Sequence, residues 1–220
     1  MQTIVQSFYL SGVKIMKNNF IGMLLVFFSI ICFTVIAMAE TIVLQPRSSG
    51  KDAHVCDCKP NETGGGNYIA YQGEWRDCYS RFLIEWDIGS LPENITITKA
   101  VMELRCCEMG GNKSGQMAFS RLIEDWSEDN VTHTTCPKHT DEDSVITDWP
   151  AVNRWHAVDI TKFVQLWYAE RDSNYGVICH SINTTGTYWV GYFTSDYRGV
   201  YRPKLTITYS INTGVKLKKP

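Results

Sequence analysis

The chain has 220 residues, of which 44% are hydrophobic and 12% aromatic, and its formal net charge is −2. This composition is sufficient for a folded core and excludes a disordered chain, and the length fits one large or two small domains. Because the chain is mildly acidic and its only cluster of lysines lies in the C-terminal tail, nucleic acid is not an expected partner.

The N-terminal segment, residues 1–39, is typical of a secretory signal peptide. Lys14 and Lys17 precede an uncharged, mostly apolar run over residues 20–36, and a small residue, Ala39, ends the segment. We predict cleavage after Ala39 and a secreted or cell-surface protein. The alternative is an uncleaved membrane anchor, because a run of this length lies near the lower limit for crossing a bilayer.

Strand signals recur along the rest of the chain. Apolar residues alternate with polar ones, as Phe82, Ile84 and Trp86 do, and this period of two is typical of half-buried strands. The first such segment differs, because its three consecutive apolar residues place hydrophobic side chains on both faces, so we expect it to be covered on both sides. The expected strands are residues 41–45, 53–57, 68–72, 81–87, 99–106, 117–123, 155–160, 175–180, 187–193 and 205–209.

One helix is expected, over residues 161–169, with Asp159 or Thr161 as its cap and Val164 and Trp167 on one apolar face. Residues 131–150 are expected to form a long loop. The sequence therefore predicts an all-β fold, an antiparallel, jelly-roll-like β-sandwich with one short helix. This single domain would cover residues 40–213 and would be followed by a basic tail, residues 214–220.

Seven cysteines follow the predicted cleavage site, and an exported chain is expected to use them in disulfides. We predict at least two disulfides, with the connectivity left open. Zinc is the less favoured alternative, because neither close pair of cysteines has the two-residue spacing of common zinc ligands. The disulfide candidates are Cys56, Cys58, Cys78, Cys106, Cys107, Cys136 and Cys179.

Four blocks in fixed order carry a family resemblance. They are SRFLIEWDIGSLPENITITKAVMELRCC, LIEDWSEDNVTH, WHAVDITKFVQLWYAERDSNYGV and YRPKLTITY, which begin at Ser80, Leu122, Trp155 and Tyr201. Together they resemble the DNRLRE-domain family, also met as disaggregatase-related and alginate-lyase-associated carbohydrate-binding modules. The resemblance covers about residues 41–210. It implies an extracellular β-sandwich that serves as a non-catalytic module on surface proteins and polysaccharide-active enzymes.

Exposed aromatic and arginine residues are the candidates for binding polysaccharide. Trp75 lies in a polar turn, whereas Trp86 and Trp167 fall on inward positions and are assigned to the core. Arginines can donate charged hydrogen bonds to an acidic sugar, although each one alone is more often part of a surface ion pair. The ligand-binding candidates are Trp75, Arg76, Arg81, Trp189, Tyr197 and Arg198.

A structural calcium ion is the only cofactor that the sequence suggests. Asp52, Asp57 and Asp159 lie at strand ends, where carboxylates can gather around calcium, although such residues more often cap turns and helices. The acidic segment 124–129 is interpreted as a structural turn, with Trp126 folded back onto the sandwich. The sequence contains no GxSxG, P-loop or HExxH pattern, so we expect no enzyme.

These features predict a secreted or cell-surface, non-catalytic module that binds polysaccharide or cell-surface glycan. The alternative is a structural subunit of an extracellular fibre or coat, in which residues 41–45 pair with the sheet edge of a neighbouring subunit and so cause self-association. A membrane would be a partner only if the signal segment is not cleaved.

Overall fold

The computed structural model describes residues 39–47, 49–111, 115–182 and 186–212, and every structural statement below concerns these residues. The chain divides into two units, residues 1–38 and residues 39–220, and the fold is that of the second. Residues 1–38 of the predicted signal peptide and the basic tail, residues 214–220, lie outside the described residues, whereas Ala39, the last residue of that predicted peptide, is the first residue of β1. No helix within the described part is long and apolar enough to cross a membrane.

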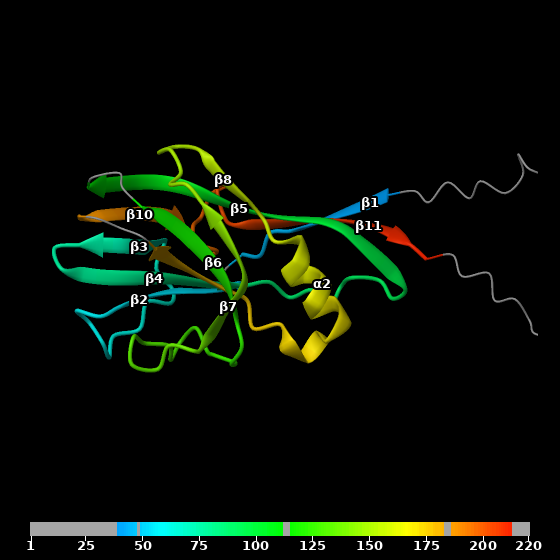
Figure 1. The fold of residues 1–220 in the computed structure, drawn as a ribbon, viewed down its shortest axis with the longest axis horizontal. Helices are drawn as coiled ribbons and strands as arrows, with labels where there is room; N and C mark the ends of the chain where they lie inside the picture. Colours follow the sequence, from blue (N-terminus) through cyan, green and yellow to red (C-terminus); the bar gives the residue numbers. More distant parts are fainter. Residues whose placement is uncertain (1–38, 48, 112–114, 183–185, 213–220) are drawn as a thin grey trace, which may run out of the picture. The chain divides into compact units, whose positions relative to one another are not determined.

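Eleven strands and one short α-helix make up the described part of the chain, which confirms the predicted all-β class (Figure 1). Every strand pair is antiparallel. The elements are β1 (Ala39–Leu44), β2 (Lys51–Cys56), β3 (Ile69–Trp75), β4 (Cys78–Glu85), β5 (Ile95–Gly111), β6 (Gln116–Leu122), β7 (His139–Thr147), β8 (Trp155–Asp159), α2 (Thr161–Ala169), the 3-10 turn η1 (Arg171–Ser173), β9 (Val177–Ile182), β10 (Tyr188–Phe193) and β11 (Lys204–Ile211).

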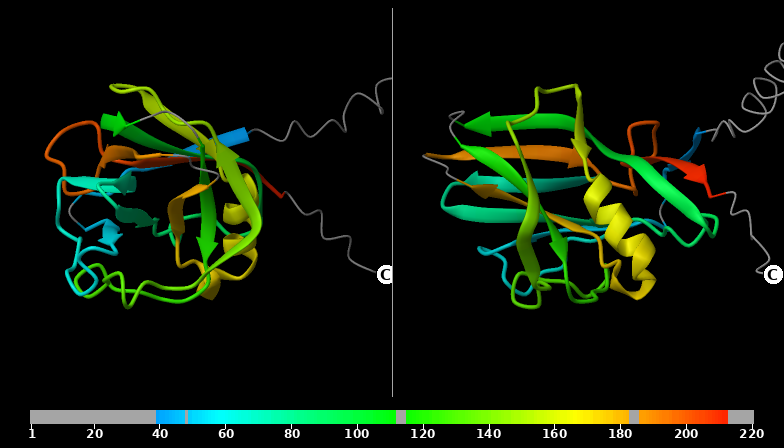
Figure 2. Two further views of the ribbon diagram at one scale, coloured as in Figure 1. Left: turned by 60° about the vertical axis from the view of Figure 1, so that its left-hand side comes forward. Right: turned by 45° about the vertical axis from the view of Figure 1, so that its right-hand side comes forward.

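The strands form one curled sheet in the order β1-β11-β5-β10-β3-β4-β9-β6-β7, with β2 added to β4 and β8 added to β5. The 17-residue strand β5 joins the two halves of this sheet (Figure 2). Its residues 95–103 pair with β11, whereas residues 106–111 pair with β10. The sheet bends along β5, so its two halves bury their apolar faces in one core.

The main core contains large side chains from most strands and from the helix. Trp86 and Trp167 are at most 1% exposed, which confirms their assignment to packing. A smaller second cluster includes Leu83, Leu122 and Ile178 and is closed by Trp126, which is 8% exposed. The indole Nε1 of Trp126 donates to the carbonyl oxygen of Tyr175 at 2.9 Å, as expected for a ring folded back onto the sheet.

The helix α2 has the predicted bounds and packs against β5 (Figure 1). The Asp159 carboxylate accepts hydrogen bonds from the backbone N–H of Thr161 at 3.0 Å and from its hydroxyl at 2.6 Å. These bonds lower the pKa of Asp159, because they favour its ionised form. Val164 and Trp167 are both buried, as the apolar face of the helix predicted.

The predicted loop over residues 131–150 contains a strand, β7, so this expectation was wrong. β7 pairs with β6 at the end of the sheet path, and the register of the pair shifts between Phe119 and Arg121. A strand at this edge has few buried side chains, and its burial pattern shows no alternation. Three consecutive acidic residues, 141–143, lie within this strand, so its sequence lacks the apolar alternation from which a strand is predicted.

The first strand is not covered on both sides as expected. β1 pairs with β11 of its own chain, with Ile42 opposite Ile207 and Leu44 opposite Leu205. Ile42 and Leu44 pack against the core, whereas Val43 between them is 54% exposed. The strand lies at the end of the sheet path, where solvent reaches one of its faces.

The seven cysteines of the described residues form one disulfide, so the prediction of at least two was wrong. Cys58 and Cys78 are bonded and lie 5.3 Å apart between their Cα atoms. The five other cysteines of the described residues are free, and two of them, Cys106 and Cys179, are buried in the core. They act there as small apolar side chains. The free cysteines are Cys56, Cys106, Cys107, Cys136 and Cys179.

Candidate functional site

An aromatic groove lies where β3, β10 and the end of β5 run side by side. Strand pairing places Trp189 of β10 between Gly73 of β3 and Gly110 of β5. Gly191, two residues further along β10, lies between Tyr71 of β3 and Glu108 of β5. Residues far apart in the sequence thus form two adjacent rows across three strands. We call the groove along these rows the aromatic groove.

Three aromatic rings line the aromatic groove. The ring centroids of Trp75 and Trp189 lie 5.9 Å apart, and those of Tyr71 and Trp189 lie 5.8 Å apart. Trp75 is 54% exposed, and Trp189 and Tyr71 are half-buried. The hollow has a volume of about 560 Å³, which is ample for a sugar unit, and it is also lined by His54, Lys59, Arg76 and Glu108.

Glycines keep the aromatic groove open. A Cβ atom at Gly110 would lie 2.7 Å from the indole nitrogen of Trp189, and a Cβ atom at Gly191 would lie 2.9 Å from Cγ of Glu108. Both distances are shorter than a van der Waals contact, so a larger residue at either position would displace the groove side chains. The Trp189 indole can lie against the backbone of β5 only because Gly110 carries no side chain.

A tight hairpin presents Trp75 and Arg76 at the end of the groove. The turn residues Arg76 and Asp77 both have positive φ, 52° and 63°, as two-residue hairpin turns require. The disulfide partner Cys78 follows the turn directly and ties it to Cys58. The Arg76 guanidinium lies 4.8 Å from the Trp75 ring centroid, so a cation rests on this indole.

Polar groups at the groove offer both donors and acceptors. The Tyr71 hydroxyl donates to Oε1 of Glu108 at 2.7 Å. Burial, together with this hydrogen bond to a carboxylate, raises the pKa of Tyr71 to about 12. Burial and the positive charge of Lys59 lower the pKa of His54, so its ring is neutral near pH 7. The groove thus combines flat apolar faces with a cation, Arg76, and a carboxylate.

The six predicted ligand-binding residues separate into three places. Trp75, Arg76 and Trp189 meet in the aromatic groove. Tyr197 and Arg198 line a second, more polar hollow of about 340 Å³ together with Arg47, Tyr68 and Arg202, and the Arg198 guanidinium lies 5.7 Å from the Tyr68 ring centroid.

Arg81, the sixth candidate, lines neither hollow. Its guanidinium lies 3.5 Å from Nδ1 of His133, and its buried Nε has no hydrogen-bond partner. Glu108 and His54 of the aromatic groove were not predicted, because no local motif marks them. Only the pairing of distant strands places them beside the tryptophans.

The three aspartates proposed for calcium do not come together. Asp57 accepts from the backbone N–H of Tyr79 at 2.7 Å, and Asp159 accepts from the backbone N–H of Thr161 at the start of α2. The N-cap residue of α2 is Ile160 and not the predicted Asp159 or Thr161. Asp52 instead lies with Glu128 and Asp196, and the carboxylate oxygens of these three lie within 4.8 Å of one another. Calcium prefers such carboxylate oxygens, so this trio is the donor set that the calcium hypothesis now requires.

Asp52 is the buried member of this acidic trio and is 2% exposed. Its Oδ2 accepts from the backbone N–H of Ser195 at 2.7 Å, but its buried Oδ1 has no hydrogen-bond partner. Burial raises the pKa of Asp52 to about 7, and the hydrogen bond from Ser195 offsets only part of this effect. Burial likewise raises the pKa of Glu128 and of Asp196.

Comparison with known proteins gives the class of the module. A search of curated proteins found no match. The sequence pattern that defines carbohydrate-binding module family 96 matches residues 44–209, which is more than half of the chain and contains the whole aromatic groove. The match supports the carbohydrate-binding part of the sequence resemblance, whereas the DNRLRE-domain name is not confirmed. The chain therefore belongs to carbohydrate-binding module family 96.

Proposed function

We propose that this chain is a secreted or cell-surface, non-catalytic module that binds polysaccharide in the aromatic groove. The observation that carries the proposal is the pair of indole rings of Trp75 and Trp189, 5.9 Å apart between centroids and open to solvent on one side. Sugars present flat C–H faces that stack on aromatic rings, and two adjacent rings suit two adjacent units of a polymer. Family membership supplies the class of ligand.

The polar rim of the groove fits a hydroxyl-rich ligand. Arg76 and Lys59 donate hydrogen bonds, and Glu108 accepts them, so a sugar stacked on Trp75 would find both kinds of partner within the same hollow. Tyr71 holds Glu108 in place through its hydroxyl. Because this pair is formed without ligand, little side-chain conformational freedom would be lost on binding.

Two features support an exported, monomeric module. The disulfide between Cys58 and Cys78 suits an oxidising compartment. β1 pairs with β11 of the same chain, and this supports the binding module over the fibre subunit, whose first strand would be donated to a neighbour.

The test is binding of the non-reduced protein to a panel of neutral and acidic polysaccharides, followed by titration calorimetry with the best ligand. Trp75→Ala and Trp189→Ala should each weaken binding by about fivefold or more, because stacking on an aromatic side chain contributes on the order of 1 to 3 kcal/mol. Arg198→Ala, which changes the second hollow, is the matched control and should bind as the unchanged protein does.

Loss of binding in Arg198→Ala with normal binding in both tryptophan variants would move the ligand site to the second hollow. If the folded protein binds no polysaccharide of the panel, in affinity electrophoresis as well as in calorimetry, the proposed function is wrong.

A further inference from the structure

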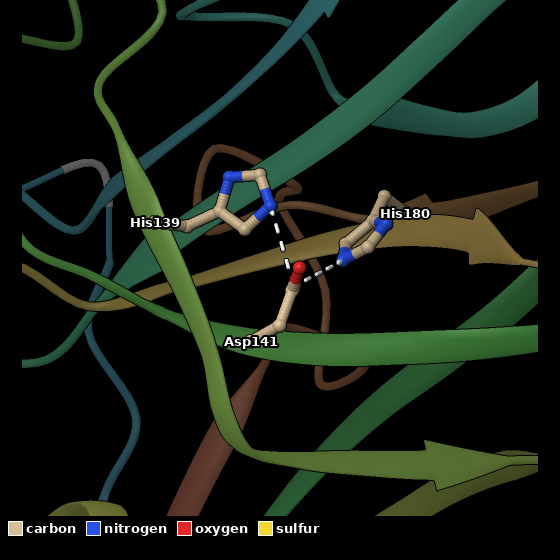
Figure 3. A group of neighbouring side chains, drawn as sticks. All are labelled: His139, Asp141 and His180. Carbon is tan, nitrogen blue, oxygen red and sulfur yellow. Dashed lines mark ion pairs between the residues drawn. The ribbon is translucent and has the colours of Figure 1, made fainter.

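A cluster of two imidazoles and one carboxylate lies away from the aromatic groove. His139 and Asp141 come from β7 and His180 comes from β9, and the three side chains point toward one another (Figure 3). The Asp141 Oδ1 atom lies 3.6 Å from Nε2 of His139 and 3.9 Å from Nε2 of His180. The centroids of the two imidazole rings are 5.1 Å apart.

The local strand geometry explains this convergence. β6 lies between β7 and β9, with Thr140 opposite Arg121 on one side and His180 opposite Ala118 on the other. The register of β6 and β7 shifts beside Ser120, and Asp143 in the bulged segment has a positive φ of 67°. Bulges of this kind redirect side chains, and here the bulge brings Asp141 over β6 toward β9.

We propose that His139, Asp141 and His180 form a binding site for a divalent transition-metal ion, with zinc as its most suitable occupant. Around a tetrahedral zinc ion with bonds of about 2.0 to 2.1 Å, neighbouring ligand atoms lie about 3.3 Å apart. The observed separations of 3.6 and 3.9 Å exceed this by a few tenths of an ångström. Rotation of the exposed Asp141 side chain can close that difference, and the ligand atoms of all three residues already lie within 4.8 Å of one another.

The donor set selects the class of metal. Two imidazole nitrogens with one carboxylate oxygen suit zinc and its neighbours in the first transition row, whereas calcium and magnesium prefer oxygen ligands alone. The His180 side chain is 14% exposed and that of Asp141 is 78% exposed, so the site has a fixed base and an open side. A fourth ligand, water or a ligand group, can enter from that side.

Neighbouring hydroxyls hold the base of the cluster. The Ser120 hydroxyl oxygen lies 3.1 Å from Nε2 of His180, 3.3 Å from Oδ1 of Asp141 and 2.7 Å from the Ser144 hydroxyl oxygen. Ser120 is fully buried, so its hydroxyl holds both side chains in place when no ion is bound, and an ion bound through Nε2 of His180 would replace the contact with that nitrogen. A bound ion would join the edge strand β7 to β9 across β6 and so stabilise the end of the sheet.

The test is titration of the full chain, purified without a histidine tag, with zinc chloride in a non-coordinating buffer. Calorimetry should show one zinc ion per chain, and the melting temperature should rise with zinc but not with calcium. His139→Gln and the isosteric Asp141→Asn should each weaken zinc binding by more than about tenfold. Glu142→Gln, the exposed neighbour in the same segment, is the matched control and should keep the affinity of the unchanged protein.

Cobalt in place of zinc separates this site from the free cysteines. The cobalt spectrum should lack a thiolate-to-metal charge-transfer band, because no thiol belongs to the cluster. The proposal is overturned if the unchanged protein binds no zinc, or if the folded double variant His139→Gln with Asp141→Asn binds it with unchanged affinity. A thiolate band would likewise assign the ion to cysteines and overturn the proposal.

Discussion

Trp86 and Trp75 are the same residue type, but the first stabilises the core and the second lines the aromatic groove. Trp86 is 1% exposed in the main core, and Trp75 is 54% exposed in the aromatic groove. Trp86→Ala should lower the free energy of unfolding by about 3 to 5 kcal/mol, because it leaves a large cavity in the core. Trp75→Ala should change it by less than about 0.5 kcal/mol. Urea unfolding of both variants measures this, and equal losses would contradict the division into core and groove.

Asp52 should make stability fall as pH rises. Its pKa is about 7 in the fold and 3.8 as an ordinary aspartate, so folding takes up a proton between these values. The stabilising contribution is fully present below about pH 3.8 and is lost as pH rises through about 7. Glu128 and Asp196 face the same carboxylate and add negative charge once they ionise.

Asp52→Asn removes this titration and keeps an oxygen acceptor for the backbone N–H of Ser195. The variant should therefore gain stability relative to the unchanged protein from pH 4 to pH 8, by about 1 to 4 kcal/mol in total, since each pKa unit corresponds to 1.36 kcal/mol. Chemical unfolding at several pH values measures the difference. Parallel stability curves for the two proteins would show that Asp52 is not the titrating group.

If Asp52, Glu128 and Asp196 bind calcium, the ion should offset the loss of stability that the ionisation of Asp52 causes. Added calcium at pH 7.5 would hold Asp52, Glu128 and Asp196 in their ionised forms and raise the melting temperature of the unchanged protein. The Asp52→Asn variant should respond much less. If calcium raises neither melting temperature, the calcium hypothesis is wrong for this set of residues.

At the scale of elements, the pairing of β1 distinguishes a monomeric binding module from a fibre subunit that donates its first strand to a neighbour. Deletion of residues 40–45 should lower the stability, because Ile42 and Leu44 lose their packing against the core and β11 loses its partner. The intact protein should remain monomeric in size-exclusion chromatography. Polymers of the intact chain, together with a folded monomer after the deletion, would favour the fibre subunit.

Val43 supplies a control for this deletion, because its side chain faces solvent. Val43→Thr keeps the strand and its pairing but changes the exposed face, so it should leave the stability almost unchanged. A loss as large as that of the deletion would mean that another surface covers this face.

The placement of apolar residues, which alternate along several strands and lie on one face of the helix, was enough to predict ten strands and the helix, since these elements each bury at least part of one face. β7 was missed because it lies at the edge and its side chains do not alternate in burial. The aromatic groove was predicted only in part. Trp75, Arg76 and Trp189 were named from their residue types, but their grouping depends on the pairing of β3 with β10, which no local pattern encodes.

At the scale of the whole molecule, the free thiols report on both the disulfide and the signal peptide. The proposed cleavage after Ala39 would remove Cys32 and leave seven of the eight cysteines, and the bond between Cys58 and Cys78 uses two of them. Thiol titration of the secreted protein under denaturing, non-reducing conditions should therefore find five thiols. Six would indicate that the N-terminal segment is retained, and three or fewer would reveal further disulfides.

The central claim is that polysaccharide binds in the aromatic groove, and oxidative footprinting tests it most directly. Hydroxyl radicals modify exposed aromatic rings, and mass spectrometry locates each modification in the presence and absence of the bound polysaccharide. We expect oxidation of Trp75 and Trp189 to fall on binding, while that of Tyr197 and Tyr201 stays the same. Protection of Tyr197 with unchanged oxidation of both tryptophans would contradict the claim.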